Sequence, residues 1–220
     1  MRLTLMSAAV IRLAQVMSVS VITGPAAAYH GGMVRWEPNA RGRLGQAAFE
    51  LFVERGFEQV TVAEIAERAG LTERTFFRYF ADKREVLFAG ADGFQELFVS
   101  GVGGAPESAA PIDAVAGALH AAAALFAAHE DGVRRRAAII AAHPDLRERE
   151  LIKLATVAAA VAGALRGRGV GDPAASLAAE AGLAVFRIAF TSWIGAPEGP
   201  GLAQLISESL DELRAVAAGK

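Results

Sequence analysis

The sequence predicts an all-α protein with a small N-terminal domain and a larger helical C-terminal domain. Hydrophobic residues make up 53 % of the 220 residues, and many are alanine, the residue with the highest helix propensity. No segment after residue 110 has a convincing strand pattern. A turn between two short amphipathic helices at residues 61–85 indicates the kind of N-terminal domain.

The composition restricts the function classes. The chain has no cysteine, which excludes disulfides and thiol chemistry and fits a cytoplasmic protein. The formal net charge is −2, so a nucleic-acid partner must be argued from where basic residues lie. The four histidines lack the H-x3-H spacing of a metal site, and no nucleophile–base arrangement is present. We therefore expect that the protein is not an enzyme, has no catalytic residues and binds no metal or cofactor.

Residues 1–37 differ from the rest of the chain. The first 32 residues are apolar and contain no acidic residue, but Arg12, Gln15 and Pro25 interrupt any signal peptide or membrane span. We expect a leader that is disordered or that precedes the true translation start, for which Met33 is the candidate. A packed extra element and a targeting or membrane segment remain the alternatives.

The first helix of the N-terminal domain is expected over residues 39–55. Pro38 precedes it, Gly56 ends it, and an apolar stripe (Leu44, Ala47, Ala48, Leu51 and Phe52) runs along it. Thr61 followed by Glu64 forms a capping box for a second helix. Phe57 and Val60 between the two helices are expected in the core.

The second and third helices form a helix-turn-helix pattern. Gly70 can adopt the left-handed conformation of the turn, and Thr72 is placed as the N-cap of a helix over residues 73–80. Phe76 and Phe80 are four residues apart and share a buried face. Thr75 and Tyr79 share another face, which can meet a groove of DNA together with residues 72–74. Asp82 is expected to cap a fourth helix that continues through residue 97.

Charges between Met33 and Gly90 balance, with nine basic and nine acidic residues, so only their placement carries information. Arg35 lies in the arm before the first helix, and Arg41 and Arg43 lie at its start. Arg74, Arg78, Lys83 and Arg84 lie on or just after the third helix, whereas the acidic residues gather on the first two. We interpret the two basic groups as phosphate contacts; an ordinary solvated surface is the alternative.

The segment of residues 38–88 resembles the N-terminal, DNA-binding domain of TetR-family transcriptional repressors, and the match is carried by the run from Ala48 to Phe88. The matching residues include Gly56-Phe57, Thr61-Val62, Ala69-Gly70-Leu71 and the run from Thr75 to Phe80, followed by Lys83. The resemblance covers about 50 residues. It implies a helix-turn-helix domain over residues 38–88 and a helical effector-binding and dimerisation domain over residues 89–220, which follow the leader expected over residues 1–37.

The resemblance also implies roles for individual residues. Thr61, Tyr79 and Lys83 would contact phosphates. Arg74 would read guanine, because a guanidinium can bond O6 and N7 together. The side chains expected along the groove are Thr72, Glu73, Arg74, Thr75 and Phe77. For Glu73, contact with a cytosine amine and stabilisation of the helix N-terminus remain equal alternatives.

In the C-terminal domain, helices are expected over residues 111–129, 132–142, 144–166, 173–194 and 202–217, after a loop at residues 101–110. None is expected to be long and apolar enough to span a membrane. An apolar stripe on the last helix (Leu202, Leu205, Ile206, Leu210, Leu213 and Val216) and small residues in the helix before it (Ala174, Ala178 and Gly182) predict a homodimer through the last two helices. An intramolecular core explains the same residues.

A site for a small-molecule effector is expected between helices of this domain. The candidate lining residues are Phe126, Ile139, Leu154, Val157, Phe186, Arg187, Phe190 and Trp193. Arg187 either faces an acidic ligand group or extends to solvent. The aromatic and aliphatic side chains among them are equally explained as plain core.

These expectations combine into one function. We expect a repressor that binds a palindromic double-stranded DNA operator as a dimer and is released by a hydrophobic or acyl-type small-molecule effector, with no membrane partner. The alternatives are a transcriptional activator and a ligand-binding helical protein whose DNA-binding domain is vestigial.

Overall fold

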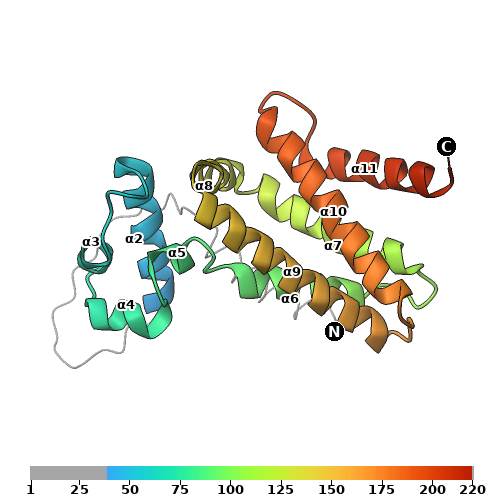
Figure 1. The fold of residues 1–220 in the computed structure, drawn as a ribbon, viewed down its shortest axis with the longest axis horizontal. Helices are drawn as coiled ribbons and strands as arrows, with labels where there is room; N and C mark the ends of the chain where they lie inside the picture. The colour runs from blue at the N-terminus through green and yellow to red at the C-terminus, as the bar shows by residue number, and fades with distance from the viewer. Residues whose placement is uncertain (1–38, 220) are drawn as a thin grey trace, which may run out of the picture. The chain divides into compact units, whose positions relative to one another are not determined.

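The computed structural model describes residues 39–219, and within this range it contains helices and no strand, which confirms the all-α prediction. The predictions for residues 1–37 lie outside the described residues. The described chain divides into two compact units, residues 39–89 and residues 90–219. The first unit contains α2 (Ala40–Arg55), α3 (Val62–Arg68), α4 (Glu73–Tyr79) and α5 (Lys83–Val86) (Figure 1). The second contains α6 (Ala91–Gly103), α7 (Pro111–Ala127), α8 (Glu130–Ala142), α9 (Pro144–Gly167), α10 (Ala174–Gly195) and α11 (Leu202–Ala217).

Helix α2 begins and ends where the sequence predicts. The side chain of Asn39, the N-cap, accepts a hydrogen bond from the backbone N–H of Gly42 at 3.1 Å. Gly56 follows the helix with a φ of 85°, a conformation that glycine adopts without steric cost. The predicted stripe on α2 is buried, and Phe52 packs edge-on against Phe57 with ring centroids 5.0 Å apart.

The helix-turn-helix is built from local interactions. Thr61 and Glu64 form the predicted capping box at the start of α3, since each side chain bonds the backbone N–H of the other residue. Gly70 has a φ of 64°, so the turn uses the left-handed conformation that a side chain would strain. Thr72 caps α4 by accepting from the N–H of Thr75 at 3.2 Å.

The prediction of one continuous helix from Asp82 through residue 97 was wrong. Asp82 does cap a helix, accepting from the N–H groups of residues 84 and 85, but α5 ends at Val86 and α6 begins at Ala91. Between them the N–H groups of residues 87–89 bond carbonyls three residues back, which is the tighter 3₁₀ pattern. All of residues 86–89 are buried, and a regular α-helix cannot hold four consecutive residues on one inward face.

The predicted loop at residues 101–110 begins later than expected. Helix α6 continues to Gly103, and the loop covers residues 104–110. A Cβ atom added at Gly101 would lie 2.9 Å from the Cβ of Ala118, so α6 and α7 approach closely here. The glycines that suggest a loop in the sequence therefore include one that permits helix packing.

In the second unit α7 packs against α6, α10 and α11, and α9 packs against α6 and α10 (Figure 1). Gly182 of α10 is buried, and a Cβ atom there would lie 2.3 Å from Cγ1 of Val115 in α7. The small residue therefore permits a close approach inside one chain. Ala174 is exposed and Ala178 is half-buried.

The apolar stripe on α11 is divided between two environments. Leu202, Ile206 and Leu210 are buried within the single chain, as the intramolecular alternative predicts. The side chains of Leu205 and Leu213 are half-buried, and Val216 is 65 % exposed. The inner half of the stripe is thus core, and only its outer edge remains available to a second chain.

The prediction that no helix is long and apolar enough to span a membrane was wrong for α10. This helix has 22 residues and a window of mean hydropathy 1.4, of which 39 % is buried inside the second unit. Helices α7 and α8 are long and apolar enough only when taken together, and the chain bends by 99° between them. A buried core helix has the same length and composition, so this finding is weak evidence for a membrane segment.

Candidate nucleic-acid interface

Helix α4 has one buried face and one exposed face. The predicted core pair is confirmed, since Phe76 is 0 % and Phe80 3 % exposed, with ring centroids 5.5 Å apart. On the other side Phe77 is 55 % exposed and Tyr79 38 % exposed. The two buried rings thus fix which side of α4 meets solvent.

The N-terminal turn of α4 carries most of the predicted groove residues. Thr72, Glu73 and Arg74 are exposed, and Thr75 is half-buried. The hydroxyls of Thr72 and Thr75 lie 3.0 Å apart and share a hydrogen bond. Arg74 makes no hydrogen bond or ion pair within residues 39–219, so its guanidinium has all its donors available.

Arg78 and Tyr79 form a pair at the other end of α4. The guanidinium of Arg78 lies 4.8 Å from the centre of the Tyr79 ring and donates to its hydroxyl at 3.1 Å. Because the hydroxyl accepts this bond, its own hydrogen is left for another acceptor. The pair presents several donors together, which suits a phosphate oxygen.

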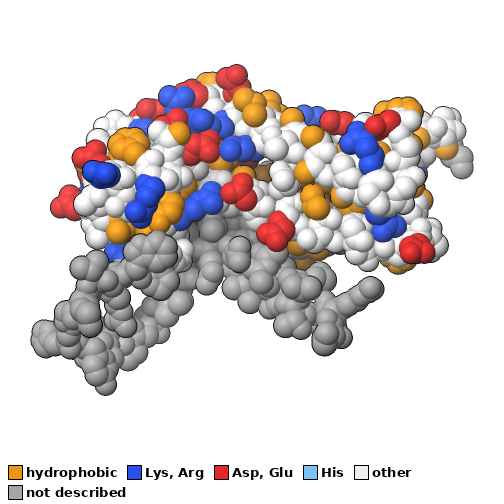
Figure 2. All heavy atoms as spheres, turned by 90° about the horizontal axis from the view of Figure 1, so that it is seen from below, with side chains coloured by type: hydrophobic (Ala, Val, Ile, Leu, Met, Phe, Trp, Pro, Cys, Tyr) orange, Lys and Arg blue, Asp and Glu red, His pale blue; other side chains and the backbone are white. Residues whose placement is uncertain are grey.

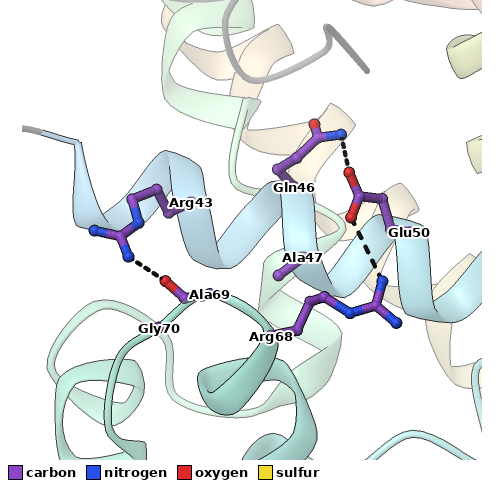
Figure 3. Close-up of a pocket in the computed structure, with 7 residues that line it drawn as sticks. All are labelled: Arg43, Gln46, Ala47, Glu50, Arg68, Ala69 and Gly70. Carbon is purple, nitrogen blue, oxygen red and sulfur yellow. Dashed lines mark hydrogen bonds and ion pairs between the residues drawn. The ribbon is translucent and has the colours of Figure 1, made fainter. Parts of the chain in front are cut away.

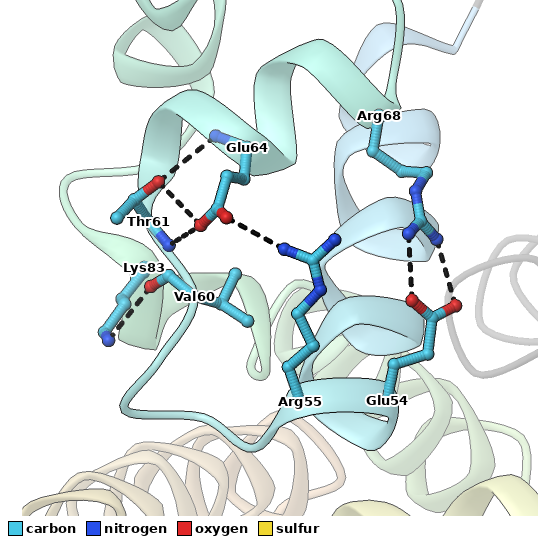
Figure 4. Close-up of polar contacts among 7 residues, drawn as sticks. All are labelled: Glu54, Arg55, Val60, Thr61, Glu64, Arg68 and Lys83. Atoms are coloured by element: carbon cyan, nitrogen blue, oxygen red, sulfur yellow. Dashed lines mark hydrogen bonds and ion pairs between the residues drawn. The ribbon is translucent and has the colours of Figure 1, made fainter.

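Ion pairs join α2 to α3 on the side where acidic residues gather (Figure 4). Arg68 binds Glu54 at 2.9 Å, and Arg55 binds Glu64 at 2.9 Å. The hydrogen bond from Arg68 lowers the pKa of Glu54. The backbone N–H and the hydroxyl of Thr61, followed by Arg55, lower the pKa of Glu64. Most of the acidic charge of these helices is therefore matched by arginines of the same two helices.

Lys83 lies at the start of α5, but its ammonium group reaches the loop between α2 and α3 (Figure 4). It donates to the carbonyls of Phe57 at 2.9 Å, Glu58 at 3.2 Å and Val60 at 3.2 Å. Nothing in the sequence around Lys83 indicates these partners, which are 23 to 26 residues away. The phosphate contact expected of Lys83 stays a prediction.

Arg43 connects the start of α2 with the turn of the helix-turn-helix (Figure 3). Its guanidinium donates to the carbonyl of Ala69, the residue before Gly70. Arg43 and Ala69 line an open hollow of about 390 Å³, and its other lining residues are Gln46, Ala47, Glu50, Arg68 and Gly70. The guanidinium therefore supports the turn, and its predicted phosphate contact is untested.

Charges of both signs lie on the face drawn in Figure 2. Figure 2 shows basic and acidic side chains next to one another over much of the visible face, without a single extended basic area. On the exposed face of α4, Arg74 and Arg78 are the basic side chains available to attract nucleic acid.

In the second unit the structure brings four of the eight predicted effector residues together. Phe126, Phe186 and Phe190 contact one another with centroids 5.6–5.9 Å apart, and Trp193 lies 5.9 Å from Phe190. Val157 is buried, and Ile139 and Leu154 are half-buried. Arg187 is exposed, as its solvent alternative predicts.

From the sequence we did not identify two members of the ring cluster, Phe94 and Phe98, or the arginine that stacks on Trp193. Phe94 and Phe98 of α6 contact Phe186 at 5.5 and 6.3 Å; their spacing of four residues, the same as in α4, was the available signal. Arg134 of α8 stacks 4.4 Å from the Trp193 ring and donates to the carbonyls of residues 193 and 194. Among residues 39–219 no group of three metal-ligating side chains is found.

Helices α3 and α4 are short and capped, and the left-handed Gly70 lies in the turn between them. The rings of Phe76 and Phe80 are buried, and helix α4 exposes hydrogen-bond donors such as Arg74. This arrangement defines a helix-turn-helix DNA-binding domain. The family model described as bacterial regulatory proteins, tetR family, matches residues 45–89, and the MftR C-terminal domain model matches residues 109–218. The chain belongs to the TetR family of transcriptional regulators.

Similar proteins agree with this assignment. Over 81 residues the chain is 38 % identical to the HTH-type transcriptional regulator TcmR of Streptomyces glaucescens, and this alignment covers 37 % of this chain and 36 % of TcmR. Over 62 residues it is 39 % identical to the HTH-type transcriptional activator FasR of Mycolicibacterium smegmatis, and this alignment covers 28 % of each. The alignments thus cover about a third of these curated relatives.

Two solved structures share the fold. A TetR-family transcriptional regulator from Syntrophomonas wolfei superposes with a TM-score of 0.60 at 15 % identity, over 82 % of this chain and 95 % of that one. SmeT, the repressor of the Stenotrophomonas maltophilia multidrug efflux pump SmeDEF, gives a TM-score of 0.56 at 19 % identity, over 80 % and 89 %. At these identities the similarity is one of fold.

Proposed function

We propose that this protein is a cytoplasmic, ligand-responsive transcriptional repressor that binds a palindromic DNA operator as a homodimer. The exposed face of α4 is the observation that carries the proposal. Thr72, Glu73 and Arg74 are exposed to solvent, whereas Phe76 and Phe80 are buried. This is the arrangement in which a recognition helix offers its N-terminal residues to base edges.

The roles within the interface follow from chemistry. Arg74 reads a guanine through two hydrogen bonds, and Phe77 contacts a thymine methyl group. Glu73 and Thr75 lie along the same groove. Thr61, Tyr79 and Arg43 contact phosphates and fix the register of the helix.

The experiment for DNA binding is selection from a random pool of duplexes, followed by gel-shift at several salt concentrations. We expect an enriched palindrome whose half-sites lie about one helical turn, ~34–36 Å, apart. No enrichment and no salt-sensitive affinity would favour the ligand-binding protein with a vestigial DNA-binding domain. Expression from the selected promoter in a deletion strain separates a repressor from an activator.

The dimer is proposed through α10 and α11. Leu177 and Ile188 of α10 are 65 and 58 % exposed, and with Ala181 and Ala184 between them they share one helix face. On α11, Val216 at the outer edge of the stripe is 65 % exposed. An apolar face of this kind suits a second copy, because paired half-sites need paired recognition helices.

Sedimentation of Ile188→Glu tests the interface. Ile152→Glu is the matched control, because Ile152 is equally exposed, at 59 %, on α9. We expect the first variant to be monomeric and the second to remain dimeric. A dimeric Ile188→Glu variant would place the interface elsewhere.

The effector is proposed to be a small hydrophobic or acyl-type molecule that binds beside the rings of α6, α7 and α10. Phe94 and Phe98 belong to α6, the first helix of the second unit, so a molecule inserted among the rings acts on the helix that follows the DNA-binding unit. SmeT, which shares this fold, has been solved in complex with triclosan. To release DNA, the effector must bind the DNA-free conformation more tightly.

Thermal shift with fatty acids, acyl-CoA thioesters and aromatic compounds tests this part of the proposal. A compound that raises the melting temperature should also release the selected duplex in a gel-shift assay. The variant Phe186→Ala should lose the response to that compound while retaining affinity for the duplex. An unchanged response in Phe186→Ala would exclude the ring cluster as the site.

A further inference from the structure

The ammonium group of Lys83 has no donor left over. An ammonium carries three N–H groups, and those of Lys83 meet the carbonyls of Phe57, Glu58 and Val60 at 2.9, 3.2 and 3.2 Å. Its nitrogen also lies 4.6 Å from the centre of the Phe57 ring, within reach of a cation–π interaction. A phosphate oxygen would have to displace one of these partners.

These contacts join the two ends of the helix-turn-helix. The three carbonyls belong to the loop that leads from α2 into Thr61, the N-cap of α3. Lys83 follows α4 and begins α5. The bonds therefore connect the segment before α3 to the segment after α4, across 23 to 26 residues of chain.

Three carbonyls of the loop converge on the ammonium group of Lys83. Three carbonyl oxygens that converge on one point repel one another unless a positive group or several donors lie between them. The neighbouring side chains of Phe57 and Val60 are buried and supply no donor. Lys83 donates to all three carbonyls, and bonds from a charged donor are stronger than neutral ones.

We propose that Lys83 is a positioning residue for DNA recognition. It fixes the loop before Thr61 and so sets the orientation of α3 and α4 relative to α2, rather than donating to a DNA phosphate. The proposal rests on the proposed DNA-binding function. It assigns Lys83 a role through its own chain in place of the direct contact that the resemblance implies.

The two roles have different thermodynamic signatures. A lost phosphate contact weakens binding to all sequences and reduces the slope of log K against log salt by about 0.9. A misoriented recognition helix instead loses base contacts, so specific affinity falls more than non-specific affinity and the slope is kept. The ratio of the two affinities therefore separates the roles.

The experiment compares Lys83→Met with Arg84→Met, which removes one positive charge from the same short helix and leaves the loop contacts in place. Affinity is measured for the duplex selected by the wild-type protein and for poly(dI-dC), at four salt concentrations, with folding checked by circular dichroism. If Lys83→Met is unfolded, Lys83→Gln, which keeps an amide donor, is measured by the same criteria.

We expect the affinity of Lys83→Met for the selected duplex to be about tenfold or more lower than that of Arg84→Met. The slope of log K against log salt should be no smaller for Lys83→Met than for Arg84→Met. The affinity of Lys83→Met for poly(dI-dC) should change little. Amide hydrogen exchange of residues 57–64 should accelerate in Lys83→Met, and exchange of α2 should not. Equal losses on both DNAs, selected-duplex affinity equal to that of Arg84→Met, or unchanged loop exchange would each overturn the proposal. Failure of the wild-type protein to bind DNA would instead reject the proposed function.

Discussion

The substitution Phe76→Ala tests the packing on which the DNA-reading face depends. Phe76 is completely buried in α4 and contacts the rings of Phe77 and Phe80, each with a centroid distance of 5.5 Å. Burying such a side chain contributes about 1.5–3 kcal/mol. The cavity left by truncation raises the expected cost to about 3–5 kcal/mol.

A loss of this size is a large part of the total stability of a small unit, which is about 5–15 kcal/mol. The unit of residues 39–89 should therefore unfold at much lower urea concentration, or be unfolded without urea. Far-UV circular dichroism follows the helices of both units, and the fluorescence of Trp193 in α10 contributes a signal from the second. An early transition in circular dichroism that leaves the fluorescence transition in place would locate the damage in the first unit.

Phe77→Ala is the matched control. The two residues are adjacent and of one type, but Phe77 is 55 % exposed. Its truncation should cost less than about 1 kcal/mol, as exposed substitutions usually do. Equal urea midpoints for the two variants would refute the assignment of an inner and an outer face to α4.

Three further outcomes are expected. Arg74→Ala should lose about 1–3 kcal/mol of binding and relax specificity at one base pair in a selection assay; a uniform loss over all sequences would make it a phosphate contact. The pKa of Glu64 is lowered in the folded state, so its carboxylate stabilises the fold only where it is ionised. The stability difference between wild type and Glu64→Gln in urea titrations should be fully present above about pH 4.3, the pKa of an unfolded Glu, and should disappear as the pH falls through the lower folded pKa. A stability difference that persists at lower pH would contradict this expectation. Gly182→Ala should destabilise by about 1–3 kcal/mol because its Cβ meets Val115, whereas Gly163→Ala, with open space around it, should be neutral or stabilising by up to ~1 kcal/mol in thermal melts.

The parts of the fold that sequence predicts best are those built from local interactions. The capping box of Thr61 and Glu64 and the pair of Phe76 and Phe80 involve residues three and four positions apart, and the left-handed turn depends on the single residue Gly70. Such signals can be read without knowledge of the rest of the chain. For the same reason the outer face of α4, and with it most of the candidate site, could be predicted.

Other features were mispredicted or left open because apolar periodicity does not report where a helix tightens or which residues cover it. Four consecutive buried residues at 86–89 read as a continuing helix, but the chain uses 3₁₀ hydrogen bonds there. Gly101 reads as loop, although it permits contact with Ala118. The α11 stripe fits both a core and a dimer surface, and half of it proved to be core.

The sequence by itself determined a helix-turn-helix, its caps and turn, and the outward direction of Thr72 and Arg74, since short-range spacing fixes each of these. Only the tertiary structure decided that Lys83 meets carbonyls about two dozen residues away, and that rings from α6, α7 and α10 meet in one cluster. Contacts between segments distant in sequence depend on how whole helices pack, and no local pattern encodes that packing.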